Sequence, residues 1–349
     1  MVTTIALDAM GSDHGPAATV EGAAILSREE GAPRIVVVGD RRTIEPLLAR
    51  FDAREDRVAL VHAPQVVPMD ADPKRGLDAN PDASILVAAQ LVRDQAADAL
   101  VSAGNTGAVA LACSRAFERL PGIRRAGLGA VYPTERLRGA RRDPFSLILD
   151  VGLTLEADAV DLVGFAIMGS AYAAAISRNE APRVALLSNG AESHKGPRAV
   201  VEAHRRLSQL SQVSFIGNVE GMDIPAGTAD VVVTGGFVGN IVLKMLEGVS
   251  ETMKRLGRYA MNESLAYKAG LALLSPAVKK LRQATDWQQY GGVPILGFDH
   301  LCIKAHGRSG PRAIANALKV ARNAVRSDTL GTIRRGLTEA ETTRWSDRP

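Results

Sequence analysis

The stretch Val231-Val-Val-Thr-Gly-Gly-Phe-Val-Gly-Asn-Ile-Val-Leu-Lys244 reads as a buried strand, a glycine turn and the start of a helix. Residues 229–234 are mostly β-branched and too few for a helix. Gly235, Gly236 and Gly239 allow a sharp turn and keep side chains away from the backbone. A helix that starts after such a turn presents free N–H groups, which suit an anion. The stretch therefore predicts either an ordinary strand-to-helix connection or an anion site.

The same unit recurs along the chain. The strand at residues 3–7 is followed by the polar loop Asp8-Ala-Met-Gly-Ser-Asp-His-Gly-Pro16, and the strand at 99–102 by Ala103-Gly-Asn-Thr-Gly-Ala108. This alternation of strands and helices predicts an α/β fold, a doubly wound and mostly parallel sheet with helices on both faces. We expect one catalytic unit over residues 1–330, with an optional subdomain division near 145–160, and a loose tail over 331–349.

Composition limits the class of protein. The chain has 349 residues, of which 46% are hydrophobic, and a formal net charge of +4. It carries no long Lys/Arg run, so we expect no nucleic-acid partner. The two cysteines, Cys113 and Cys302, are too few for a disulfide framework, and the histidines show no metal spacing, so no metal site is predicted. We see neither a signal peptide nor an uncharged apolar run of membrane-spanning length, which predicts a cytoplasmic protein.

Two segments leave alternatives open. Residues 123–143 hold six arginines, which form either a solvated face or a docking patch for an acidic partner. Residues 247–286 are helical, apolar on one side and basic on the other. They predict an amphipathic helix pair that either faces the core or contacts anionic lipid. The expected membrane contacts are Leu271, Leu274, Val278, Leu281, Lys279 and Lys280. Residues 290–297 read as a glycine-rich loop.

The loops after the strands supply the candidate site, because ligands bind at the carboxyl ends of strands in open parallel sheets. Asp13 and His14 read either as a proton-handling pair or as a capping aspartate beside an exposed histidine. The predicted substrate-binding residues are Asp8, Gly11, Asp13, Gly104, Asn105, Thr106, Asn218, Gly236, Gly239 and Asn240.

Seven loops in order resemble one known family. They are Asp8-Ala-Met-Gly-Ser-Asp-His-Gly-Pro, Ser102-Ala-Gly-Asn-Thr-Gly-Ala, Leu149-Asp-Val-Gly, Phe215-Ile-Gly-Asn-Val-Glu-Gly, Gly236-Phe-Val-Gly-Asn, Tyr290-Gly-Gly and Ile303-Lys-Ala-His-Gly. Together they resemble the acyl-ACP:phosphate acyltransferases, the PlsX family, across residues 5–320.

The resemblance implies an α/β/α homodimer related to phosphotransacetylases and isopropylmalate dehydrogenases. It implies that fatty acyl-ACP and inorganic phosphate give acyl phosphate and acyl carrier protein (ACP), for bacterial phospholipid synthesis. It also implies peripheral attachment to an anionic membrane through the helix pair, and no cofactor.

The chemistry fits such a reaction, because phosphate is already an oxyanion and needs no activated Ser or Cys. Lys304 or Lys195 is expected to neutralise phosphate. His306 or His14 is expected to protonate the leaving thiolate or to donate to an oxyanion.

Several positions depart from the family's usual motifs. Gly235 stands where an acidic residue is usual, Met222 where an arginine is usual, and Thr154, Ser188 and Pro197 are also altered. Two alternatives therefore stay open: a phosphotransacetylase-like enzyme that uses acyl-CoA, and a non-catalytic paralogue that binds ACP and membrane. A nicotinamide dehydrogenase is disfavoured, because no Gly-x-Gly-x-x-Gly follows a strand with a well-placed acidic residue.

Overall fold

A single sheet organises the computed structural model, which describes residues 2–138, 143–262 and 291–341 together with residues 264, 267, 274 and 345. It has 11 strands in the order β3-β2-β1-β4-β11-β10-β5-β6-β9-β7-β8. The strands are β1 (Thr4–Asp8), β2 (Arg34–Gly39), β3 (Val58–His62), β4 (Ala99–Ser102), β5 (Gly127–Arg138), β6 (Asp143–Leu149), β7 (Arg183–Leu187), β8 (Ser214–Val219), β9 (Val231–Val233), β10 (Gly292–Leu296) and β11 (Leu301–Ala305).

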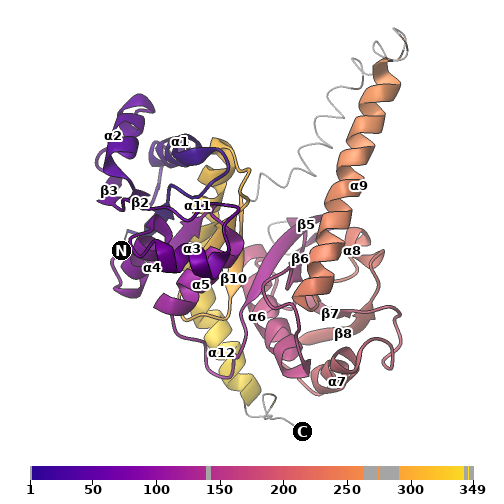
Figure 1. Cartoon of the computed structure of the whole chain (residues 1–349). Coiled ribbons are helices and arrows are strands. Elements are labelled where there is room, and N and C mark those ends of the chain that lie inside the picture. Colours follow the sequence, from indigo (N-terminus) through magenta and orange to yellow (C-terminus); the bar gives the residue numbers. More distant parts are fainter. Residues whose placement is uncertain are drawn as a thin grey trace.

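Helices cover both faces of this sheet (Figure 1). They are α1 (Gly15–Ser27), α2 (Arg41–Arg50), α3 (Pro73–Ala79), α4 (Ser84–Arg93), α5 (Thr106–Ala116), α6 (Ala159–Ser177), α7 (Arg198–Leu207), α8 (Asp223–Ala226), α9 (Gly236–Asn262), α11 (Pro311–Arg326) and α12 (Thr329–Glu341). Buried residues of α4 and α5 join one core with partly buried residues of α9. On the opposite face, α1 and α11 cover one half of the sheet, and α6, α7 and α12 cover the other. The predicted α/β class with helices on both faces is confirmed.

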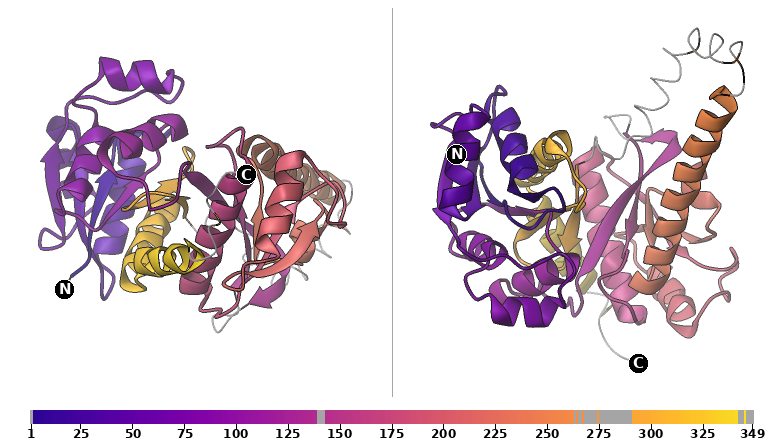
Figure 2. Two further views of the ribbon diagram at one scale, coloured as in Figure 1. Left: turned by 90° about the horizontal axis from the view of Figure 1, so that it is seen from below. Right: turned by 45° about the horizontal axis from the view of Figure 1, so that its top comes forward.

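The sheet changes direction in its middle. β10 is antiparallel to both β11 and β5, and β5 is antiparallel to β6. β6, β9, β7 and β8 are parallel to one another, so they run opposite to β1, β4 and β11. The carboxyl ends of the two parallel sets therefore lie at opposite edges of the sheet. Figure 2 shows the two halves side by side.

Two of the strands correct the sequence interpretation. The arginine-rich segment contains β5, and the glycine-rich segment at 290–297 contains β10 rather than a loop. Gly292 is required inside β10, because a Cβ there would lie 2.6 Å from Ile303 Cγ2. A glycine that serves close packing within a strand looks the same in sequence as a glycine that serves a turn. The arginines are not all a free surface, since Arg124 forms ion pairs with Asp158 and Asp161.

The expected loose tail is corrected over residues 331–341, which belong to α12. Ile333, Leu337 and Ala340 are buried in the core beneath α6, and so is Trp345. The remaining positions of the predicted tail, 342–344 and 346–349, lie outside the described residues.

α6 is the one described helix long and apolar enough to cross a membrane by length and composition. It has 19 residues, and 78% of its most apolar 18-residue window is buried inside the fold.

α9 is one continuous helix from the glycine turn to Asn262, and it extends beyond the body of the molecule (Figure 1). The second helix of the predicted pair falls mostly outside the described residues. Of the expected membrane contacts only Leu274 is described, and its side chain is 60% exposed. Leu271, Val278, Lys279, Lys280 and Leu281 lie outside the described part.

Candidate active site

Three polar side chains form a row across neighbouring strands. Asp8 ends β1, Ser102 ends β4, and Lys304 is the penultimate residue of β11. Ser102 pairs in register with Asp8 on one side and with Lys304 on the other. All three are buried, with relative exposures of 1%, 0% and 5%. The parallel pairing of β1, β4 and β11 therefore places a carboxylate, a hydroxyl and an amine on one face, at one edge of the sheet.

Asp8 is held by two hydroxyl groups. Ser84 Oγ donates to Asp8 Oδ1 at 2.6 Å, and Ser102 Oγ donates to Asp8 Oδ2 at 2.7 Å. Burial raises the pKa of Asp8, while these hydrogen bonds and the charge of Lys304 act in the opposite direction. We call Asp8, Ser84, Ser102 and Lys304 the Asp8 cluster.

Two glycine loops close over the Asp8 cluster. A Cβ on Gly11 would lie 2.7 Å from Gly104 Cα and 3.2 Å from Asp8 Oδ2. A Cβ on Gly104 would lie 3.3 Å from the same carboxylate oxygen. The backbone N–H of Gly104 also donates to Ser102 Oγ at 3.0 Å. Both predicted glycines therefore border the Asp8 cluster, and they allow the two loops to approach each other.

Lys304 is a buried amine whose pKa lies close to neutral pH. Burial lowers its pKa to about 8, while Asp8 and Asp13 favour the charged form. Its ammonium donates to the carbonyl oxygen of Ala305. An amine with this pKa is mostly a cation at pH 7, and it has donor capacity left for an anion.

His306 follows Lys304 on the loop after β11. The backbone N–H of Arg308 donates to His306 Nδ1 at 3.1 Å, so a neutral ring carries its proton on Nε2. Partial burial lowers the pKa of His306, and the nearby cations Lys244 and Lys304 lower it further. The neutral imidazole, with its proton on Nε2, is the form that this environment favours.

The Asp13–His14 loop lies against the same segment. Asp13 N donates to Gly307 O at 3.0 Å, and His14 Nε2 donates to Arg308 O at 3.2 Å. The structure thus joins Asp13 and His14 to the loop that carries His306. The Nε2–H group of His14 therefore already donates a hydrogen bond to a backbone carbonyl oxygen.

Asn105 and Thr106 lie at the start of α5, beside the Asp8 cluster. The side chain of Asn105 caps the helix by accepting from Ala108 N at 3.1 Å. Its amide nitrogen donates to Met69 O at 2.9 Å and Ala71 O at 3.2 Å. Asn105 therefore positions the surrounding loops through contacts that occupy its own side chain.

The start of α9 lies at the opposite edge of the sheet, against the loop that begins at Asp150. Gly236 N donates to Thr154 O at 2.8 Å, and Phe237 N donates to Leu155 O at 3.4 Å. A Cβ on Gly239 would lie 1.9 Å from Asp150 O. Two of the N–H groups expected to hold an anion are thus used by the protein, and the glycines serve close packing. Asn240 is exposed beside Gly152.

Asp150 is the centre of that second loop. Its buried carboxylate accepts from the backbone N–H groups of Leu128, Gly152, Leu153 and Thr154. Burial raises its pKa, and these hydrogen bonds counteract the increase. The altered motif residue Thr154 takes part in this network and also donates from Oγ1 to Ala126 O at 2.8 Å.

α9 connects the two edges. It starts beside Asp150, packs on the sheet through Val242, Leu243 and Leu246, and brings Lys244 and Glu247 into the electrostatic surroundings of His306. Lys244 and Glu247 also pair with each other at 2.8 Å.

Lys195 and Asn218 lie on the half of the sheet bounded by β7 and β8. Asn218 donates from Nδ2 to Glu192 O at 2.8 Å and contacts His204 Nδ1 through Oδ1 at 3.0 Å. It thereby fixes the loop that carries Lys195. The sheet order separates β7 and β8 from β11, so these two residues are not brought into the Asp8 cluster within one chain.

The chain matches the model of the fatty acid synthesis protein family over residues 3–331. A phosphate acyltransferase from Myxococcus xanthus is 42% identical over 319 residues, which cover 91% of this chain and 88% of that protein. The chain belongs to the fatty acid synthesis protein family, PlsX.

Solved structures share the PlsX fold at low identity. EutD phosphotransacetylase from Staphylococcus aureus has a TM-score of 0.58 and 16% identity, with coverage of 92% of this chain and 94% of that one. A 4-hydroxythreonine-4-phosphate dehydrogenase from Klebsiella pneumoniae has a TM-score of 0.53 and 15% identity, with coverage of 93% and 98%. These likenesses confirm the predicted relation of the fold to phosphotransacetylases and dehydrogenases.

Sequence reasoning missed two parts of this PlsX site. Ser84 lies 76 residues from Asp8 in the chain and stands in no recognisable motif. Lys244 and Glu247 read as helix-surface charges, and only the path of α9 places them near His306. The loop that carries His306 also contains Ser309, whose buried Oγ has no hydrogen-bond partner among the described residues.

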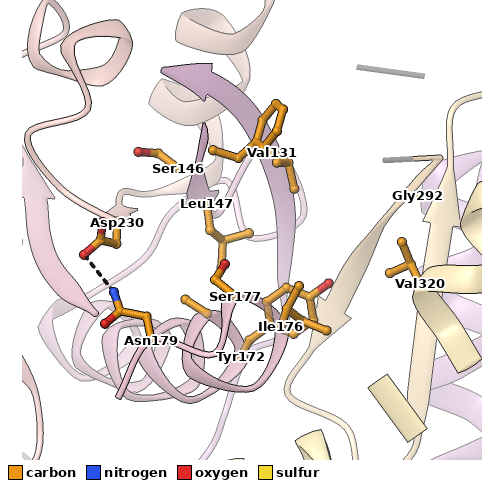
Figure 3. Close-up of a pocket in the computed structure, with 12 residues that line it drawn as sticks. Val131, Ser146, Leu147, Tyr172, Ile176, Ser177, Asn179, Asp230, Gly292 and Val320 are labelled. Atoms are coloured by element: carbon orange, nitrogen blue, oxygen red, sulfur yellow. Dashed lines mark hydrogen bonds between the residues drawn. The ribbon is translucent and has the colours of Figure 1, made fainter. Parts of the chain in front are cut away.

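A pocket opens on the other face of the PlsX sheet, between β5, β6, the last turns of α6 and α11 (Figure 3). It encloses about 620 Å³ of empty space, its open mouth included. Val131, Leu147, Tyr172 and Ile176 make its lining mostly apolar. Along β11, Leu301, Ile303 and Ala305 face the pocket side of the sheet. Cys302 and Lys304 alternate with them and face the other side. The pocket is therefore separate from the Asp8 cluster.

Proposed function

We propose that the chain is a phosphate acyltransferase that transfers a fatty acyl group from acyl carrier protein to inorganic phosphate. The family and the name of the 42% identical relative support the reaction class. The observation that carries the proposal is Lys304, a buried amine with a pKa of about 8. It precedes the loop of His306, in which His306 and Arg308 are exposed. A cation held in this way suits a phosphate dianion.

The proposed reaction needs no covalent enzyme intermediate. A phosphate oxygen attacks the thioester carbonyl carbon, a C–O bond forms, and the C–S bond breaks with its electron pair leaving on sulfur. The thiolate of the carrier then takes up a proton. Phosphate is already anionic, so positioning and stabilisation of the developing oxyanion supply the catalysis.

Lys304 holds the phosphate in this proposal, and His306 donates from Nε2 to the carbonyl oxygen as negative charge develops there. His306 is assigned this role because it follows Lys304 closely in the chain and its surroundings favour the neutral ring. A neutral imidazole is a suitable donor to an oxyanion. Lys195 and the Gly236–Asn240 segment remain predicted site residues, and they lie at the other edge of the sheet.

The direct test is acyl phosphate formation. The purified protein is incubated with phosphate and either palmitoyl-ACP or palmitoyl-CoA, and acyl phosphate is trapped as the hydroxamate. Product from the ACP thioester, with little from the CoA thioester, is expected. Product from CoA alone would identify a phosphotransacetylase-like enzyme. Absence of product from both would favour a binding protein. Replacement of His306 by Ala with full activity retained would contradict the role of that residue.

The surface of α9 supports a homodimer as part of the proposal. A stripe of exposed apolar side chains follows the helix at intervals of three and four residues, which places them on one face. Its members are Ile241, Met245, Val249, Met253 and Leu256, each 51–63% exposed. An apolar stripe of this length marks an interaction surface. We assign it to the α9 helix of a second copy.

Peripheral membrane attachment at the far end of α9 completes the proposal. Tyr259, near the end of α9, is 69% exposed, Leu274 is 60% exposed, and Arg255 and Arg258 add positive charge. Exposed apolar side chains together with cations suit an anionic lipid surface. The protein is then cytoplasmic and reversibly bound to the membrane that receives its product.

A further inference from the structure

Ser84 occupies an unusual position for a serine at a helix start. It is the first residue of α4 and is 2% exposed. A serine in this region commonly caps the helix, but no side-chain cap is present at the start of α4. Its hydroxyl donates instead to Asp8 Oδ1 at 2.6 Å, across 76 residues of sequence. The hydroxyl of Ser84 therefore serves the carboxylate of another element.

The two oxygens of Asp8 are both occupied. Ser84 donates to Oδ1 and Ser102 donates to Oδ2, so the carboxylate accepts on both sides. Gly11 and Gly104 close over it. Hydrogen bonds of this kind favour the ionised form of a buried carboxyl group. The two hydrogen bonds thus counteract the burial that raises the pKa of Asp8.

Lys304 receives the effect of this anion. Asp8 on β1, Asp13 on the loop after β1 and Cys302 on β11 all favour the charged form of Lys304. His306 lies on the loop that follows Lys304 and β11, and Lys244 and Glu247 on α9 act on His306. Burial opposes the charge on Lys304, and the carboxylate of Asp8 supports it.

We infer that Ser84 is a positioning residue: with Ser102 it holds Asp8 as a carboxylate, and this carboxylate keeps the Lys304 ammonium charged for binding the phosphate dianion. The inference rests on the proposed function, because it takes phosphate as the ligand of Lys304. It assigns to α4 a role in setting the pH range over which the site binds its anion.

The test is the affinity for inorganic phosphate as a function of pH, measured by calorimetry on the full-length protein. Wild-type affinity should fall as pH rises through about 8, where Lys304 loses its proton. Asp8→Asn should move this fall to lower pH by about one unit or more, because a nearby opposite charge is lost. Ser84→Ala should move it in the same direction by roughly a few tenths of a unit. Ser84→Thr keeps the hydroxyl and should retain the wild-type profile.

Ser27→Ala is the matched control. Ser27 is also fully buried, and its hydroxyl donates to Ala24 O at 2.7 Å, within α1. This variant removes a buried hydroxyl outside the Asp8 cluster, so the pH profile should not move.

Three results would overturn the inference: an unchanged profile in Ser84→Ala, a weakening that is equal at every pH, or a Ser84→Thr variant that behaves like Ser84→Ala. If Ser84→Ala fails to fold, Asp8→Asn against wild type decides whether the carboxylate supports the Lys304 charge. Phosphate binding is measured without turnover. A wild-type protein that binds phosphate with the expected profile but forms no acyl phosphate would therefore remove the proposed function and leave the inference standing.

Discussion

Lys304 costs the fold stability because its charge is kept away from water. Its relative exposure is 5%, and its pKa is about 8 instead of 10.5. Below pH 8 the lysine is protonated in both the folded and the unfolded chain, so the full penalty applies. Between pH 8 and 10.5 the folded form loses its proton first, and the penalty fades as pH rises. A group that is costly at neutral pH is expected where function needs it.

Lys304→Met should therefore separate stability from function. The difference of about 2.5 units from the ordinary pKa corresponds to about 3 kcal/mol, at about 1.4 kcal/mol per unit, as an upper figure for the stability gained at pH 7. Denaturant unfolding at pH 7 and pH 10 measures it, and the gain should be smaller at pH 10. Acyl phosphate formation should fall by roughly 100-fold or more, since a preorganised cation is lost. A variant less stable than wild type at pH 7 would contradict this account of Lys304.

At the scale of elements, what the sequence could predict depends on how local the signal is. The motifs after β1, β4 and β11 led to the expectation that Asp8, Gly11, Gly104 and Lys304 lie together, and the parallel register brings them together. Ser84 could not be found in this way, because its contact depends on how α4 packs over β1. β10 was misread because its glycine serves close packing. The amphipathic pattern in residues 247–286 did indicate an apolar helix face, and part of that face is now visible on α9.

The stripe on α9 can be tested by placing a charge in it. Met245→Glu combined with Met253→Glu should dissociate the proposed dimer, because each carboxylate would have to be desolvated at the interface. Light scattering after size-exclusion chromatography gives the mass directly. Arg258→Glu, on the polar face of the same helix, serves as the control and should leave the mass unchanged. A double variant that stays dimeric would move the interface away from α9, and a monomeric wild type would remove the proposed homodimer.

At the scale of the molecule, the reversal at β10 and β5 decides how the site is assembled. A parallel sheet with one direction would place the loops that follow its strands at one edge. The antiparallel pairings divide the loops into two groups. α9 crosses the sheet between these groups, on the face that α4 and α5 cover. Strand direction is set by pairing partners far apart in the chain, so no local motif records it.

On the opposite face of the sheet, which α1, α6 and α11 cover, α12 joins the two halves. It follows α11, which covers the β1–β4–β11 half, and it packs on α6, which covers the other half. Leu337 is 1% exposed at this contact. A helix in this place should contribute to the stability of the whole fold, in contrast to the loose tail that its polar composition suggested.

Leu337→Ala should lower the free energy of unfolding by about 2–4 kcal/mol, because it leaves a cavity between α12 and α6. Arg335→Ala is the matched control on the same helix, where an exposed ion pair with Asp328 is lost and a change of about 0.5 kcal/mol or less is expected. Denaturant unfolding of both variants gives the comparison, and hydrogen exchange shows whether α6 loses protection together with α12. Equal stability of Leu337→Ala and wild type would mean that α12 does not pack on α6 in solution. A loss of protection confined to α12 would mean that it is an appendage and does not join the halves of the sheet.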